Sequence, residues 1–73
     1  MHIYLEIVEK LGEDESMVKQ PQELRIEVSS REEAVKKYEE LKHLFARVSY
    51  VARVHYHYHD EGKPCEVEVI EET

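Results

Sequence analysis

Apolar and polar residues alternate in four stretches of the chain. The alternation covers residues 2–10, 23–28, 50–58 and 65–70, where every second side chain is apolar over at least three repeats. Successive side chains of a β-strand point to opposite faces, so this period of two is typical of strands with one buried face. The sequence therefore predicts four half-buried strands.

A helical spacing replaces this alternation between the second and third strands. Ser30 and Glu33 have the S-x-x-E form of a capping box, in which each side chain satisfies a free amide of the first turn. Apolar residues then recur three and four positions apart, which is typical of an amphipathic helix. The sequence predicts a helix that begins after Ser30 and carries one apolar stripe. The stripe consists of Ala34, Val35, Tyr38, Leu41, Leu44, Phe45 and Val48.

These elements predict a single α+β domain over residues 1–73, with the order ββαββ. One helix covers one face of a sheet, so the other face stays open. Tyr4, Val8 and Val51 make the outer faces of the first and third strands more apolar than those of the second and fourth. Since edge strands tend to carry charges, we expect a four-stranded antiparallel sheet in the order 2-1-3-4. Residues 12–21, GEDESMVKQP, form a long acidic loop between the first two strands.

The pattern also suggests a register for the last two strands. If Glu61 and Gly62 form a two-residue turn, residues whose numbers add up to 123 lie opposite each other. Cys65 then faces the helix, and a glutamate lies across from each of two histidines. The inward pairs are Tyr58 with Cys65, Tyr56 with Val67 and Val54 with Val69; the outward pairs are His57 with Glu66, His55 with Glu68 and Arg53 with Ile70.

The stretch RVHYHYHD, residues 53–60, carries three histidines at alternate positions. Burying three imidazoles would cost several kcal/mol in unpaired polar groups, so we expect His55, His57 and His59 on the open face. Imidazole and carboxylate suit zinc, nickel or copper. Two adjacent histidines with Glu66, and His2 from the first strand, are candidate ligands. The alternative is a water-exposed strand in which glutamates stabilise the histidines across the sheet.

The composition of the chain disfavours several classes of partner and location. The chain has 10 Lys and Arg against 17 Asp and Glu, a net charge of −7, which repels phosphate backbones and disfavours nucleic acid. Its single cysteine excludes an intramolecular disulfide. No apolar run approaches the ~20 residues of a membrane helix, and no signal-like segment opens the chain. We therefore expect a cytoplasmic protein with no membrane association.

Two functions are compatible with this architecture. The first is a non-catalytic interaction module that self-associates or binds a protein partner through the open face, with Tyr4, Val8, Val51 and Ile70 as apolar anchors. The alternative is a metal- or pH-responsive protein whose candidate ligands, for zinc or nickel, are His55, His57, His59 and Glu66. We expect no enzyme, because one helix and a short chain leave little room for a concave site that excludes water. A hydrolytic metalloenzyme is therefore the third alternative.

Overall fold

The computed structural model describes residues 1–10 and 22–73, so the predicted acidic loop over residues 12–21 lies outside the described residues. Most element bounds agree with the sequence pattern to within two residues. The elements are β1 (His2–Glu9), β2 (Glu23–Val28), α1 (Arg31–Leu41), the 3₁₀ turn η2 (Lys42–Phe45), β3 (Tyr50–His57), the 3₁₀ turn η3 (His59–Glu61) and β4 (Glu66–Glu72).

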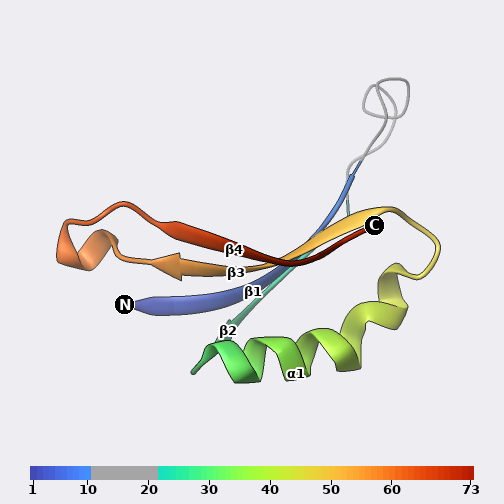
Figure 1. The fold of residues 1–73 in the computed structure, drawn as a ribbon, viewed down its shortest axis with the longest axis horizontal. Helices are drawn as coiled ribbons and strands as arrows, with labels where there is room; N and C mark the ends of the chain where they lie inside the picture. Colours follow the sequence, from blue (N-terminus) through green and yellow to red (C-terminus); the bar gives the residue numbers. More distant parts are fainter. Residues whose placement is uncertain (11–21) are drawn as a thin grey trace.

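The strands form one antiparallel sheet in the order β2-β1-β3-β4, and α1 lies against one face (Figure 1). The predicted α+β fold and strand order are therefore confirmed. Between the two central strands, β1 and β3, His2 lies opposite His57 and Tyr4 lies opposite His55. This register brings polar side chains of β1 beside the histidines of β3.

The hydrophobic core lies between the sheet and the helix. Leu5, Ile7 and Val54 point from the sheet toward Tyr38 of the helix, and all four are fully buried. The hydroxyls of Tyr38 and Tyr50 are 2.7 Å apart, so these two buried polar groups form a hydrogen bond with each other. The buried set is Leu5, Ile7, Val28, Ala34, Tyr38, Phe45, Tyr50, Ala52 and Val54.

The helix begins at the predicted cap. The Ser30 hydroxyl accepts a hydrogen bond from the Glu33 amide at 3.1 Å. The Glu33 carboxylate accepts from the amide of Ser29 at 3.1 Å and also from the Ser29 hydroxyl. The return bond of the capping box therefore goes to the residue before the cap, which fixes the turn that leads from β2 into α1.

The helical stripe is shorter than predicted. The α-helix ends at Leu41 and continues as a 3₁₀ turn, which has three residues per turn instead of about 3.6. Because of this change in pitch, Phe45 is buried whereas Leu44 is 56% exposed. The prediction that Leu44 widens the buried stripe is wrong.

The predicted register of β3 and β4 is also wrong, by one residue. Arg53 lies opposite Val69 and His55 opposite Val67, and a bulge between Ala52 and Arg53 changes the register at the far end. The connection is longer than a two-residue turn, because η3 precedes Gly62, which has a φ of +70°. As a result, Val67 and Val69 face away from the helix.

An ion pair between helix and sheet accompanies this register. Arg31 Nε lies 2.9 Å from both carboxylate oxygens of Glu68, and its Nη2 lies 2.8 Å from one of them. The end of the β3–β4 hairpin projects beyond the helix (Figure 1). Ile70, predicted on the open face, instead packs against the core.

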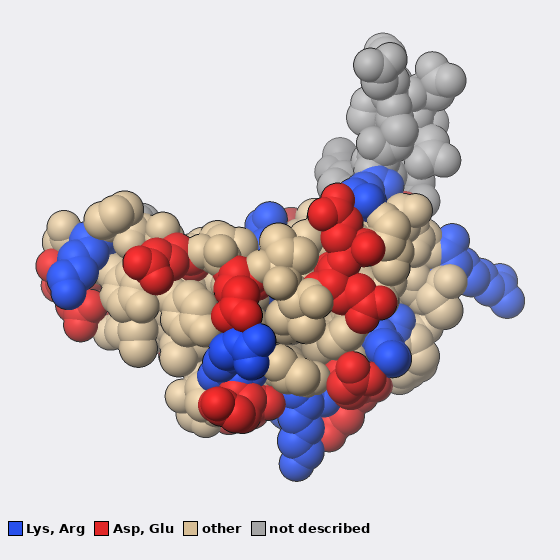
Figure 2. Space-filling view, viewed as in Figure 1, with Lys and Arg blue, Asp and Glu red and all other residues tan. Residues whose placement is uncertain are grey.

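Charged side chains of both signs are interspersed over the side of the molecule that shows β4 and the helix (Figure 2). Several of them form surface ion pairs, such as Lys42 with Glu39 at 3.0 Å and Lys10 with Glu72 at 3.2 Å. In the part of the chain that the structure describes, no helix has the length and apolar character needed to cross a bilayer.

The buried phenol of Tyr38 is expected to make the free energy of unfolding decrease at alkaline pH. Burial, and then the hydrogen bond with Tyr50, raise the pKa of Tyr38 far above its ordinary value of about 10. A folded pKa above the unfolded one gives stability that is complete below pH about 10 and is lost as the pH rises further. In urea unfolding, Tyr38→Phe should be less stable than the wild type by about 1 kcal/mol at neutral pH.

Above pH about 10 the difference should shrink, because the variant has no Tyr38 phenol to ionise on unfolding. Tyr4→Phe, which changes a tyrosine of the open face, is the control. A constant difference between Tyr38→Phe and the wild type at all pH values would contradict this assignment.

Candidate metal centre

The open face of the sheet presents four rows of side chains that run across the strands. Three of the rows contain one residue of each strand, and the fourth contains one residue each of β1 and β3 together with Cys65, which comes just before β4 begins. Charged and apolar residues fill the rows at one end, and histidines fill those at the other. The rows are Glu23–Val8–Val51–Glu72, Arg25–Glu6–Arg53–Val69, Glu27–Tyr4–His55–Val67 and His2–His57–Cys65.

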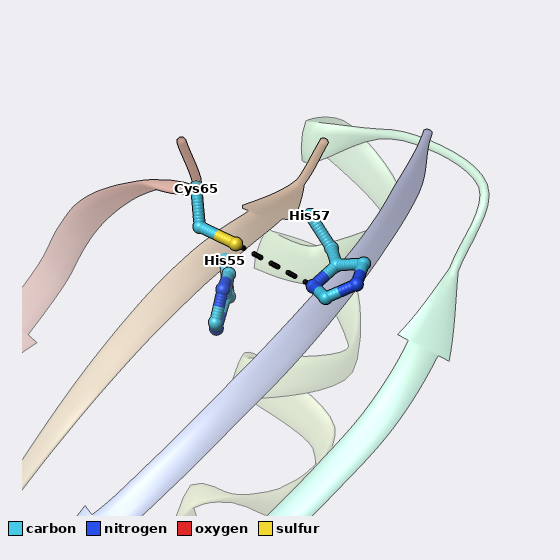
Figure 3. A group of neighbouring side chains, drawn as sticks. All are labelled: His55, His57 and Cys65. Atoms are coloured by element: carbon cyan, nitrogen blue, oxygen red, sulfur yellow. Dashed lines mark hydrogen bonds between the residues drawn. The ribbon is translucent and has the colours of Figure 1, made fainter. Parts of the chain in front are cut away.

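Three ligand-type side chains converge at the histidine end of this face. His55, His57 and Cys65 each offer one ligand atom, and the three atoms lie within 4.8 Å of one another. The Cys65 thiol points toward the His57 ring, with Sγ 3.4 Å from Nδ1 (Figure 3). All three residues are partly buried. We call this group the His–His–Cys cluster.

The cluster differs from the set that the sequence predicted. Cys65 was expected under the helix, but the register shift turns it to the open face beside His57. The same shift puts Glu66 opposite Tyr56, on the helix side of the sheet, so Glu66 does not join the histidines. His59 lies in η3, past the end of β3, and its side chain is outside the described part of the structure.

His2 is engaged elsewhere on the same face. Its Nδ1 lies 2.9 Å from a carboxylate oxygen of Glu27, and its Nε2 lies 3.5 Å from one of Asp60. Its ring centroid is 6.4 Å from that of His57. His2 therefore borders the cluster without supplying a ligand to it.

His55 has two ring nitrogens in different surroundings. Nδ1 lies 3.1 Å from a carboxylate oxygen of Glu6. Nε2 is buried and has no hydrogen-bond partner among the described residues. Buried polar atoms are usually paired, so the second nitrogen calls for an explanation.

Glu6 is a buried carboxylate on the face that the helix leaves open, and only 5% of its side chain is exposed. Arg53 Nε donates to one oxygen at 2.7 Å, and Arg25 Nε lies 3.2 Å from the other. Burial favours the protonated acid, but the hydrogen bonds and charges of Arg53 and His55 outweigh it and lower the pKa of Glu6. The alternation predicts that Glu6 points outward, and these neighbours cover it.

The apolar residues of the open face include three of the four predicted anchors, since Ile70 packs against the core, and two valines that were not predicted there. Tyr4, Val8 and Val51 lie on this face, partly buried. Val67 and Val69, which were expected under the helix, are 52% and 53% exposed there. Val67 lies opposite His55 of the His–His–Cys cluster, and the row that contains Glu6 and Arg53 separates it from Val51.

The donor set of the cluster is two imidazoles and one thiol. This combination suits borderline and soft transition metals more than magnesium or calcium, which prefer oxygen ligands. No protein-family model, curated protein or solved structure matches this chain. The geometry of the cluster is therefore the basis for a functional proposal.

Proposed function

We propose that this protein is a metal-binding protein that holds a zinc ion through His55, His57 and Cys65. The observation that supports the proposal is the convergence of three ligand atoms within 4.8 Å. Tetrahedral zinc, with bonds of about 2.0–2.3 Å, separates its ligand atoms by about 3.5 Å. The Sγ–Nδ1 distance of 3.4 Å already has this value. A shift of about 1 Å in the more distant pair would complete the geometry.

The proposed site would join two strands. Two ligands come from β3 and the third precedes β4, at the hairpin end that projects beyond the helix. An ion bound there would act as a cross-link between β3 and the residue that precedes β4. The described ligands occupy three positions, so a water or an added donor would fill the fourth. The proposed function is therefore metal-dependent stabilisation of the hairpin, without catalysis.

Cobalt(II) provides a direct test, because it occupies zinc sites and absorbs light through its bonds to sulfur. Titration of the reduced protein should give a sulfur-to-cobalt charge-transfer band that saturates at one ion per chain and disappears when zinc is added. Cys65→Ser should lack the band. His43→Gln, which changes an exposed histidine of η2, should retain it. A wild type without the band, or a Cys65→Ser variant with it, would contradict the site.

Thiol modification should report the same site. In the metal-free protein Cys65 lies on the open face and should react with an alkylating reagent in the folded state. Zinc should slow this reaction strongly, because a metal-bound thiolate is a poor nucleophile toward the reagent and is shielded by the ion. Mass spectrometry of the alkylated fraction over time gives the rates. Equal rates with and without zinc would argue against coordination by Cys65.

The exposed valines favour a second candidate function, self-association through the open face. Val67 and Val69 are half-exposed, and they lie on the same face as Val51 and Val8. The occupant we propose is a second copy of this chain, which would cover the exposed valines. Sedimentation should then show a dimer that Val67→Glu dissociates and Leu44→Glu, on the helix side, does not. A monomer at high concentration would rule this function out.

A further inference from the structure

The two nitrogens of His55 have distinct roles in the geometry of the open face. A neutral imidazole carries one N–H donor and one acceptor lone pair. The neighbour of Nδ1 is the carboxylate of Glu6, which accepts hydrogen bonds when ionised. The proton of a neutral His55 therefore belongs on Nδ1, and the lone pair is left on Nε2, the buried nitrogen without a partner among the described residues.

Glu6 is itself held in place from both sides. One of its oxygens accepts from Arg53, and the other serves both Arg25 and His55. The guanidinium of Arg25 is also packed on the ring of Tyr4, 4.2 Å from its centroid. These contacts restrict the rotation of the carboxylate, and they occupy the oxygens that would otherwise compete for an ion.

From this arrangement we infer that Glu6 is a positioning residue for the His–His–Cys cluster. It holds the His55 proton on Nδ1 and orients the ring, so that Nε2 is the atom that binds the metal. Metal-bound histidines commonly donate their other ring nitrogen to a carboxylate, which fixes the tautomer and makes the ligand more basic. The inference rests on the proposed metal-binding function and adds an outer carboxylate to it.

A purely structural role for Glu6 predicts something different. Glu6 could serve only to neutralise Arg25 and Arg53 on the open face. In that case the tautomer of His55 would not depend on Glu6, and removing the carboxylate would change stability without a specific effect on the metal. The ring-nitrogen signals of His55 separate the two roles, because they report which nitrogen carries the proton.

The first measurement is nitrogen NMR of the metal-free, full-length protein at a pH where His55 is neutral. The wild type should show the proton on Nδ1, and zinc should then shift the Nε2 signal. In Glu6→Gln the tautomer preference should weaken. A wild type with the His55 proton on Nε2 overturns the inference without any variant, so the test does not depend on whether Glu6→Gln folds.

The second measurement is the affinity for cobalt(II). Glu6→Gln should bind 10–100-fold more weakly than the wild type, which is the usual loss when an outer carboxylate is removed, while keeping the sulfur-to-cobalt band. Glu27→Gln is the matched control, since its carboxylate bonds the Nδ1 of His2, outside the cluster. Equal affinity in Glu6→Gln and the wild type overturns this inference alone. A wild type that binds no cobalt overturns the proposed function, and the metal role of Glu6 with it.

Discussion

Zinc at a free concentration of about 100 times its Kd is expected to raise the free energy of unfolding by about 2.7 kcal/mol, if the unfolded chain does not bind it. For a domain of this size, the midpoint of thermal unfolding should rise by roughly 10–20 °C. The physical reason is that the three ligands come together only when β3 and β4 are paired. Differential scanning calorimetry with and without zinc, under reducing conditions, measures the shift.

Cys65→Ser should lose most of this shift, because a hydroxyl is a far weaker zinc ligand than a thiolate. His43→Gln should keep all of it, since His43 is an exposed residue of η2 outside the cluster. If zinc stabilises Cys65→Ser as much as the wild type, the ion binds at ligands other than the His–His–Cys cluster.

Leu5→Ala is expected to destabilise the fold by about 2–5 kcal/mol. Leu5 has no exposed surface and lies in a central strand, between Val54 of β3 and Ile26 of β2. The truncation removes buried methyl groups and leaves a cavity that a sheet cannot easily close. A chain of this length is stable by only about 4–11 kcal/mol, so this loss is a large share of the whole free energy of unfolding.

The matched control is Leu44→Ala. Leu44 is 56% exposed in η2, and the same truncation there should change the stability by less than about 0.5 kcal/mol. Urea unfolding followed by circular dichroism measures both variants. Similar losses for the two would mean that Leu44 is part of the core, as the helical stripe alone suggested.

The alternation of apolar residues was sufficient to predict most of the fold. In β1, β2 and the first half of β3, one set of alternate residues is wholly apolar or aromatic and the other contains most of the charged and polar residues, so one orientation is strongly favoured. The charged outer residues of β2 indicated one edge correctly. The other edge is β4, as predicted, but the outer face of that strand carries Val67 and Val69 in place of the expected glutamates. The Ser30 cap could be predicted from the sequence because the motif consists of two residues three positions apart.

The sequence pattern did not predict the register of β4 correctly. Its sequence alternates valine with glutamate, so the alternation alone places Val67 and Val69 under the helix, whereas both face away from it. Two features that the alternation does not contain accompany the observed register. One is the longer connection through η3 and Gly62, and the other is the bidentate pair between Arg31 and Glu68.

The sequence by itself determined that His55 and His57 share the open face, because imidazoles at alternate positions follow the period of the strand. Only the tertiary structure decided which residues join them. A shift of one residue in β4 exchanges its two faces, which brings Cys65 to His57 and removes Glu66. The burial of Glu6 likewise depends on Arg25 and Arg53, from the two strands that flank β1, and the pairing of strands distant in sequence is what places them there.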